Sequence, residues 1–368
     1  MPIVAPNPHV LEIVPYIAGE AKLPGFDHPA KLSSNESPLG PSPAALDAYV
    51  KAGAELERYP DGAAIELRET LARAHGLASD QVVCGTGSEQ LIDGLCRAYA
   101  GPGDEVVFTE HAFIMYHVAT LACGATPVRV PEVEYTADVD AMLAAVTPQT
   151  RIVFIANPNN PTGTVIDRAA LHRLREGLPE NVLLVVDAAY CEYIDTPDYS
   201  FGAELVQPVD GNTVVLHTFS KIYGLAALRV GWARCPREVA MVLHRVRGVF
   251  NVATPAQLAA IAALGDTAHI AKARDHNDRW LPWLAERIAA LGFKVTPSAG
   301  NFLLFHCADE NERVALDQAL RGAGIILRPV ANYGLPAALR ATIGIEDENR
   351  RMVDVLERFV ANRQAPKV

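Results

Sequence analysis

The sequence has no apolar run of the roughly 18 residues that a membrane-spanning helix requires. Its first residues, MPIVAPNPHV, contain neither the basic nor the apolar stretch of a secretory signal. No block of like charge occurs, and 32 basic against 43 acidic residues leave a formal net charge of −11. Because an acidic surface repels phosphate backbones and anionic lipids, we expect neither a nucleic acid nor a membrane as a partner. These absences predict a cytoplasmic protein.

Sequence patterns for disulfides and metals are also missing. None of the six cysteines forms a C-x-x-C pair, and the eleven histidines include no H-E-x-x-H. His269 and His276 are seven residues apart on one predicted helix, a spacing that a solvated or packed face explains more often than a metal site. We expect buried thiols in a reducing compartment and no metal site.

Apolar residues are abundant, at 50% of the chain, and charged residues make up 20%. At roughly 100–200 residues per domain, the length favours two domains, or one large α/β unit with an appendage. Short β-branched runs alternate with helical stretches such as 88–100 and 167–178. This alternation predicts a mostly parallel sheet with right-handed crossovers. The predicted strands cover 81–84, 104–109, 126–130, 151–156, 181–187, 212–218 and 229–233.

The pattern changes near Thr254, where one long helical stretch precedes short strands and two further helices. We therefore predict an α/β protein in three parts. An N-terminal arm and connector, 1–45, would pack on the small domain. A large domain, 46–264, would contain a mostly parallel seven-stranded sheet flanked by helices, and 265–368 would form a smaller α+β domain.

Two turns follow predicted strands and could bind ligands. Gly85-Thr86-Gly87-Ser88-Glu89 opens a helix, whose free N–H groups can bind an anion. The dinucleotide fingerprint G-x-G-x-x-G is incomplete here, because Gln90 stands where its third glycine would be. The turn could therefore be a simple helix cap instead of a phosphate site. The segment NPNNPTG, 157–163, lies at the predicted carboxyl end of a strand, where open α/β sheets bind ligands. Asn160 could offer an amide there, although a tight structural loop explains the pattern equally well.

An aspartate and a tyrosine follow the apolar run NVLLVV. The carboxylate of Asp187 is expected to be partly buried, so it needs a cation or a hydrogen-bond donor. It could simply cap the next helix. Alternatively, Asp187 and Tyr190 could hold an aromatic ring, with the acid at a ring nitrogen and the phenol at a ring oxygen.

A lysine follows the predicted buried strand NTVVLHT. Small and apolar neighbours disfavour the charge of Lys221, so its free amine becomes accessible. Such an amine is what Schiff-base chemistry requires. Most lysines are surface charges, but Ser220 before it and Arg229 eight residues after it make that interpretation the weaker one here.

In their order and spacing, NPNNPTG, VVDAAY, TFSK and GLAALRVG resemble the pyridoxal-phosphate aminotransferases of the aspartate aminotransferase fold, fold type I. LSSNESPLGPSP, ERYPDG, GTGSEQLI and LRATIG agree with this resemblance. VLEIVPYIAGE is similar to the N-terminal arm of the histidinol-phosphate aminotransferase branch. One departure is Ala188, where relatives usually have glutamate; the family does not use that side chain to contact the cofactor.

The resemblance implies pyridoxal 5'-phosphate (PLP) as the cofactor and gives the motif residues roles. Lys221 would bond to the cofactor aldehyde and then move a proton, and Asp187 would pair with the ring nitrogen. Asn160 and Tyr190 would hydrogen-bond the ring oxygen, and Phe113 would stack on the ring. The residues that would hold the phosphate are Gly87, Ser88, Thr218, Ser220 and Arg229.

The resemblance also implies a homodimer with shared active sites, because Tyr59 matches a tyrosine that reaches the cofactor phosphate of the neighbouring subunit. Arg340 would bind the anionic end of the substrate, and Tyr16, Asn35 and Arg328 would assist it.

The implied function is a transferase reaction of histidine biosynthesis. Histidinol phosphate and 2-oxoglutarate would give imidazole acetol phosphate and glutamate. An aromatic amino acid aminotransferase is the nearest alternative, because the same pocket can take a flat ring and an anion. A PLP-dependent decarboxylase of an amino acid phosphate is less favoured. A regulator with a degenerate aminotransferase domain would be expected to carry an additional DNA-binding module.

Overall fold

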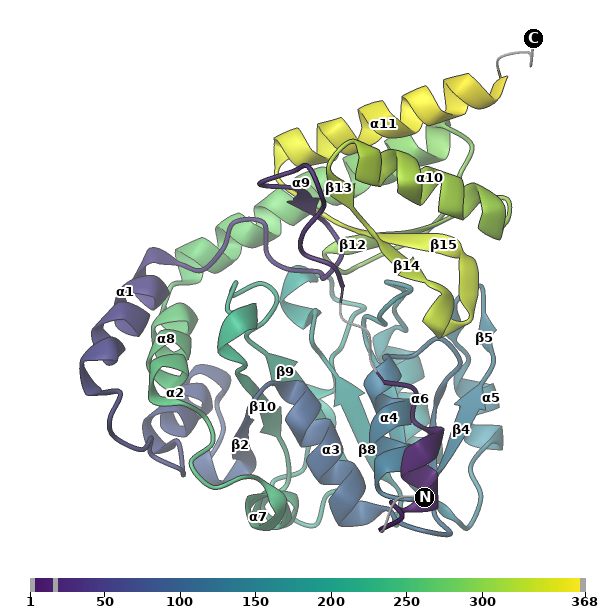
Figure 1. Ribbon diagram of the computed structural model, residues 1–368. Coiled ribbons are helices and arrows are strands. Elements are labelled where there is room, and N and C mark those ends of the chain that lie inside the picture. Colours follow the sequence, from purple (N-terminus) through teal and green to yellow (C-terminus); the bar gives the residue numbers. More distant parts are fainter. Residues whose placement is uncertain (1–3, 16–18, 365–368) are drawn as a thin grey trace.

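The computed structural model describes residues 4–15 and 19–364. Figure 1 shows a large α/β unit with a smaller α+β unit above it. The large unit is built on a seven-stranded sheet of order β2-β10-β9-β8-β7-β3-β4, in which only β10 runs antiparallel to its neighbours. Its strands are β2 (Val82–Gly85), β3 (Glu105–Thr109), β4 (Thr126–Val130), β7 (Thr150–Ala156), β8 (Leu183–Asp187), β9 (Thr213–Thr218) and β10 (Gly231–Arg234).

Helices cover both faces of this sheet, which explains why its strands are apolar throughout. In β8, Leu183 and Val185 belong to the core on one face, whereas Leu184 and Val186 belong to the core on the other. The first core includes α3 (Ser88–Tyr99), α4 (Ile114–Ala122) and α7 (Arg237–Val246), and the second includes α5 (Val139–Ala144) and α6 (Arg168–Gly177). At the β2 edge, α1 (Pro43–Ala52) and α2 (Ile65–His75) pack against α8 (Thr254–Gly265).

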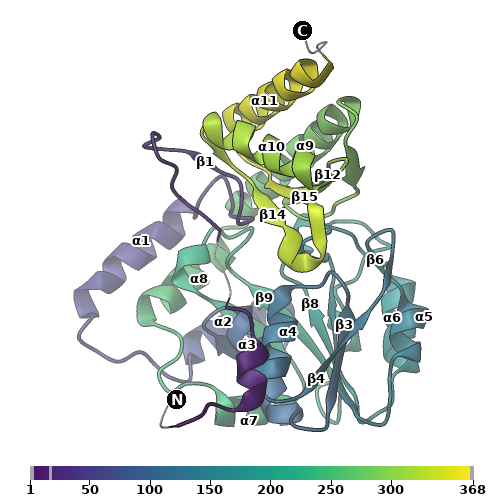
Figure 2. The same cartoon turned by 45° about the vertical axis from the view of Figure 1, so that its right-hand side comes forward.

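The small unit has a four-stranded antiparallel sheet of order β11-β12-β15-β14. Its strands are β11 (Lys294–Thr296), β12 (Phe302–His306), β14 (Arg328–Val330) and β15 (Leu335–Thr342). Residues of α9 (Thr267–Ala290), α10 (Glu310–Gly322) and α11 (Glu346–Gln364) share one hydrophobic core with this sheet. Figure 2 shows these helices stacked on the side away from the large unit.

The predicted fold class is confirmed: the chain has a large, mostly parallel seven-stranded sheet flanked by helices, and a separate smaller sheet. The long helical stretch predicted after Thr254 is two helices, because the side chain of Asp266 accepts a hydrogen bond from the backbone N–H of His269 and starts a new helix there. The domain boundaries predicted at 45/46 and 264/265 stay predictions.

Two parts of the predicted arm lie against different units. β1 (Ala30–Lys31) pairs in parallel with β13 (Ile325–Ile326) beside the small sheet. The short 3-10 helix η1 (Pro8–Glu12) instead lies against α4 of the large unit, as Figure 2 shows. The remaining short elements are β5 (Glu132–Val133), β6 (Thr136–Ala137), η2 (Gly53–Glu55), η3 (Ser79–Gln81), η4 (Cys191–Tyr193), η5 (Ala203–Leu205), η6 (Ala226–Leu228) and η7 (Ala331–Tyr333).

Within the described ranges, no helix combines the length and the hydrophobicity needed to span a membrane.

Candidate active site

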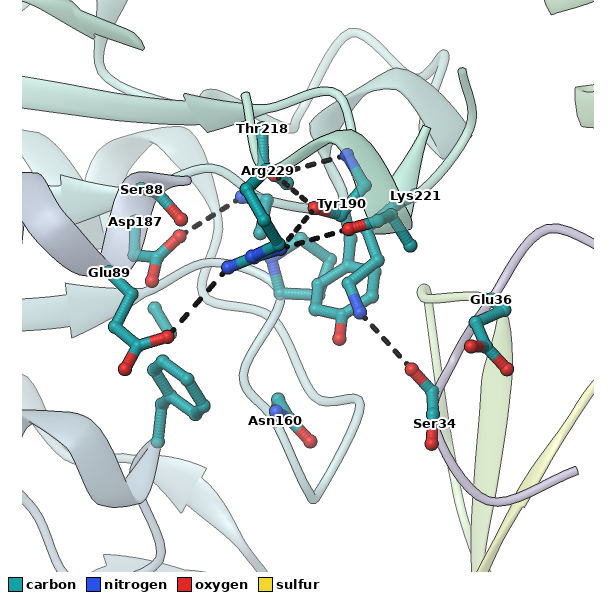
Figure 3. A pocket seen from close by; sticks show the side chains of 16 residues that line it. Ser34, Glu36, Ser88, Glu89, Asn160, Asp187, Tyr190, Thr218, Lys221 and Arg229 are labelled. Atoms are coloured by element: carbon teal, nitrogen blue, oxygen red, sulfur yellow. Dashed lines mark hydrogen bonds and ion pairs between the residues drawn. The ribbon is translucent and has the colours of Figure 1, made fainter. Parts of the chain in front are cut away.

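A pocket lies at the carboxyl ends of three neighbouring parallel strands, β7, β8 and β9. Its wall includes Asp187 and Thr218, the last residues of β8 and β9, and Asn160 from the segment that follows β7. The connector 33–36 comes down over the pocket from the side of the small unit, as Figure 3 shows for Ser34 and Glu36. The predicted site residues that line it are Ser88, Phe113, Asn160, Asp187, Tyr190, Thr218, Ser220, Lys221 and Arg229.

Lys221 points across the pocket to the connector. Its Nζ donates a hydrogen bond to the carbonyl oxygen of Ser34 at 3.3 Å and lies 5.5 Å from the ring centroid of Tyr190. Burial lowers the pKa of Lys221 to about 7, and the positive charges of Arg340 and Arg229 act in the same direction. A substantial fraction of this amine is therefore uncharged, and nucleophilic, at neutral pH.

Asp187 is the last residue of β8 and is 5% exposed. Its Oδ2 accepts a hydrogen bond from the hydroxyl of Tyr116 at 2.8 Å, and its Oδ1 accepts one from the backbone N–H of Ala189 at 3.2 Å. Burial raises the pKa of Asp187, and these two hydrogen bonds oppose that rise. The carboxylate thus faces the pocket and caps no α-helix.

Tyr190 and Asn35 form a buried hydrogen-bonded pair. The Nδ2 of Asn35 donates to the Tyr190 hydroxyl oxygen at 2.9 Å. The Oδ1 of Asn35 accepts a hydrogen bond from the Thr342 hydroxyl at 3.2 Å, which fixes the orientation of the amide. Burial raises the pKa of Tyr190 to about 12, so the phenol keeps its proton at neutral pH. Since the oxygen already accepts from Asn35, its proton is free to be donated into the pocket.

Arg229 and the start of α3 form a cluster of donors suited to an anion. Arg229 Nη1 donates to Ser220 Oγ at 3.2 Å, and Thr218 Oγ1 donates to the same oxygen at 2.9 Å. α3 begins at Ser88, directly after Gly87, which has φ of 79°. A Cβ at Gly87 would lie 2.5 Å from Arg229 Nη2 and would push that guanidinium aside, and the positive φ itself favours glycine. Figure 3 shows Arg229 pointing toward Glu89, whose Oε2 is 3.8 Å from Nη2.

Arg340 of β15 reaches the pocket from the small unit. It donates hydrogen bonds to Asn160 Oδ1 and, at 2.7 Å, to the carbonyl oxygen of Ser33. Arg328 of β14 is its cross-strand partner and lines a neighbouring cavity rather than the pocket itself. The two arginines therefore come from one face of the small sheet.

Tyr59, which was also predicted for the site, does not reach the pocket within this chain. Tyr59 is 80% exposed and stacks on Phe250, with ring centroids 4.4 Å apart. Tyr16 lies outside the described residues.

The two histidines that share a predicted helix face bind backbone. His269 Nε2 is 3.1 Å from the carbonyl oxygen of Gly40, and His276 Nε2 is 2.9 Å from that of Gly344. Elsewhere, Cys191, Glu192 and His217 bring possible ligand atoms within 4.8 Å of one another. The absence of a metal site stays a prediction.

The family model of the class I and II aminotransferases matches residues 27–356. The chain belongs to this family. It is 51% identical, over 97% of its length and 98% of the relative, to the histidinol-phosphate aminotransferase of Paramagnetospirillum magneticum. It is 52% identical, over 97% and 98%, to the histidinol-phosphate aminotransferase of Dinoroseobacter shibae.

Solved structures have the same fold as this aminotransferase. The histidinol-phosphate aminotransferase from Sinorhizobium meliloti, solved in complex with pyridoxal-5'-phosphate, superposes with a TM-score of 0.88 at 26% identity, covering 98% of this chain and 99% of that one. An aromatic aminotransferase from Pyrococcus horikoshii superposes with a TM-score of 0.81 at 21% identity, over 91% and 96% of the two chains, which shows the fold alone.

Sequence reasoning missed four polar residues in or next to this aminotransferase pocket. Ser34, Glu36 and Glu89 line the pocket, and Tyr116 donates a hydrogen bond to the Asp187 carboxylate. The first three stand beside predicted residues in LSSNESP and GTGSE, so their neighbours were a usable signal. Tyr116 follows Phe113 by three residues in HAFIMY, and only the start of α4 at Ile114 turns it toward Asp187.

Proposed function

We propose that this aminotransferase uses PLP to transfer the amino group of histidinol phosphate to 2-oxoglutarate, giving imidazole acetol phosphate and glutamate in histidine biosynthesis. The chemistry rests on one observation: an amine with a pKa of about 7, Lys221, shares a pocket with the buried carboxylate of Asp187. The choice of substrate rests on two relatives that are named histidinol-phosphate aminotransferase. Their sequences are 51% and 52% identical to this chain over 97% of its length.

The residues of the pocket fit PLP. The cluster of Arg229, Ser220 and the α3 N-terminus suits a phosphate, because the first N–H groups of an α-helix have no partner within the helix. Asp187 suits a protonated ring nitrogen, and Phe113 offers an aromatic face. When bound, PLP supplies an electron sink that makes the Cα proton of the amino acid acidic.

The chain's own groups would then do three things. Lys221 Nζ, being partly uncharged at neutral pH, would hold the cofactor through its aldehyde carbon, with the aldehyde oxygen leaving as water, and would later accept and return a proton. Asp187 holds the proton on the ring nitrogen because its carboxylate is buried and has few other partners. The hydroxyl of Tyr190, oriented by Asn35, donates to the ring oxygen together with the amide of Asn160.

The substrate's phosphate would bind at the face of the small sheet from which Arg328 and Arg340 extend, with Asn35 and Tyr16 nearby. The test compares histidinol phosphate with phenylalanine and tyrosine as amino donors in steady-state kinetics. We expect kcat/KM to be highest for histidinol phosphate. A clear preference for phenylalanine or tyrosine would replace this substrate by an aromatic amino acid, and release of carbon dioxide would replace transamination by decarboxylation.

We also propose a cytoplasmic homodimer with active sites shared between subunits. In support, exposed apolar side chains lie on α1, on the loop before α2 and on the loop before α8. The stacking of Tyr59 on Phe250 joins the two loops into one surface. These side chains are Leu46, Tyr49, Val50, Leu56, Val249 and Phe250, and Ile65 at the first position of α2 is exposed as well.

Mixed dimers test the sharing of sites. Tyr59→Ala and Lys221→Ala should each be poorly active alone, because each lacks one group in both sites. A mixed dimer contains one subunit of each variant. In one of its two sites an intact Lys221 meets an intact Tyr59 from the other subunit, so activity should partly return. If no activity returns although mixed dimers form, then Tyr59 does not act across the interface.

A further inference from the structure

We propose that Tyr116 is a positioning residue of this aminotransferase: its hydroxyl keeps the Asp187 carboxylate ionised and in one orientation, ready for the ring nitrogen of the cofactor. The inference rests on the proposed function, since it concerns how the protein prepares one group of the site for PLP.

The contact is short and lies in the interior. Tyr116 is 0% exposed, and its hydroxyl donates to Asp187 Oδ2 at 2.8 Å. The other oxygen of the carboxylate accepts from the backbone N–H of Ala189. A carboxylate taken out of water loses most of its hydration, so each donor that reaches it stabilises the charged form over the neutral form. Tyr116 is a side-chain donor whose removal leaves the backbone of the site unchanged.

The aromatic packing fixes the direction of the hydroxyl. The Tyr116 ring stacks on Phe154, with centroids 4.6 Å apart and planes 5° apart, and it meets the ring of Phe113 edge-on at 5.8 Å. Phe113 in turn lines the pocket. A ring held on two sides cannot swing away from Asp187 without disturbing the pocket wall. Burial also raises the pKa of Tyr116 well above its usual range, so the phenol remains a donor at neutral pH.

A consequence for cofactor binding follows. Asp187 attracts a protonated ring nitrogen only when the carboxylate is ionised, so the affinity of the apoprotein for PLP falls as the pH drops through the pKa of Asp187. A hydrogen bond to the ionised form lowers that pKa. Removal of the Tyr116 hydroxyl raises it, so affinity should begin to fall at a higher pH in Tyr116→Phe than in the wild type.

The experiment measures the Kd of PLP for the full-length apoprotein over a range of acidic to neutral pH, by quenching of tryptophan fluorescence. For Tyr116→Phe we expect the midpoint of the affinity loss to move up by about one pH unit, which corresponds to roughly tenfold weaker binding on the acidic limb. In turnover, kcat should fall more than KM for the amino donor changes, because substrate contacts are untouched. An unchanged midpoint would overturn the proposal.

Two further variants separate positioning from general stability. Tyr199 is also buried, and its hydroxyl donates to the backbone carbonyl of Asn157 at 2.7 Å. Tyr199→Phe should therefore lower the free energy of unfolding without moving the midpoint, and an equal shift in this variant would show that Tyr116 acts only through stability. In an Asp187→Asn background, Tyr116→Phe should cause no shift, because no carboxylate remains to titrate. A wild type that neither binds PLP nor transaminates would contradict the proposed function instead, so the two failures are distinct.

Discussion

Arg328 and Arg340 lie directly opposite each other on the antiparallel strands β14 and β15. Residues in this relationship extend from the same face of a sheet, so the side chains of the two arginines start close to each other. Facing like charges repel, and an anion between them relieves the repulsion. A phosphate dianion relieves it better than a carboxylate, because it carries nearly twice the charge and offers three acceptor oxygens.

We expect Arg328→Ala to weaken the use of histidinol phosphate more than that of phenylalanine. Loss of one charge-assisted hydrogen bond costs about 1.5–3 kcal/mol, so the ratio of the two kcat/KM values should fall roughly 10- to 150-fold. Arg287→Ala, on α9 beside Trp283, removes an arginine from the same unit outside the pocket and should leave the ratio unchanged. Equal losses for both substrates would mean that Arg328 has a structural role.

The Lys221→Ala variant should still bind PLP through the phosphate and ring contacts but should lose covalent attachment and turnover. The absorption of the attached cofactor should be absent from its spectrum. Borohydride treatment of the wild type, followed by digestion and mass spectrometry, should place the cofactor on the peptide that contains Lys221. A label on any other lysine would contradict the assignment.

A methyl group at position 87 should disturb phosphate binding specifically. The Cβ of Gly87→Ala would meet Arg229 Nη2 at 2.5 Å, and φ is 79° there. We expect the Kd for PLP to rise at least about tenfold, since displacing Arg229 removes a charged donor. Gly76→Ala is the matched control, because Gly76 also has a positive φ, of 65°, but open space around its Cβ position. That variant should lose about 1 kcal/mol or more of stability and keep its cofactor affinity. Similar losses of affinity in both variants would refute the steric argument.

Lys221 should also give the apoprotein a pH-dependent stability. Its pKa is about 7 when folded, whereas an unfolded lysine has a pKa near 10.4. Between these values the unfolded chain binds a proton that the folded protein does not, so the free energy of unfolding rises with pH. Lys221→Met keeps the apolar stem and removes this titration. In denaturant unfolding, the variant should be more stable than the wild type near neutral pH, and its advantage should shrink as the pH approaches 10.4. A difference that does not change with pH would argue against a depressed pKa.

The fold could be read from the sequence to a large extent because its signals are local. β8 was predictable because VLLVV, 182–186, is apolar at every position, as both faces of the strand are covered. The break between α8 and α9 was missed because apolar periodicity continues on both sides of Asp266, whose role as a cap depends on local hydrogen bonding.

The candidate site likewise contains residues that local motifs predict and contacts that no local motif predicts. Lys221, Asp187 and Asn160 each belong to a recognisable motif at or just after the end of a strand. These strands are adjacent in the sheet, so the meeting of the three residues in one pocket follows from sheet topology. Contacts that span the chain could not be derived in this way. The bond from Asn35 to Thr342 joins residues 307 positions apart, and no local pattern encodes it.

The four-residue connector 33–36 has a consequence for the order in which the protein is made. Ser33 accepts a hydrogen bond from Arg340, and Asn35 is bonded to Thr342, so both depend on β15. During synthesis from the N-terminus, the ribosome releases Lys221 and Asp187 well before this strand emerges. The large sheet can therefore form, with Lys221 and Asp187 in place, before Thr342 of β15 is available to hold Asn35. Until then, the residue that orients Tyr190 is itself not fixed. The catalytic pocket is completed only when one of the last strands of the polypeptide arrives.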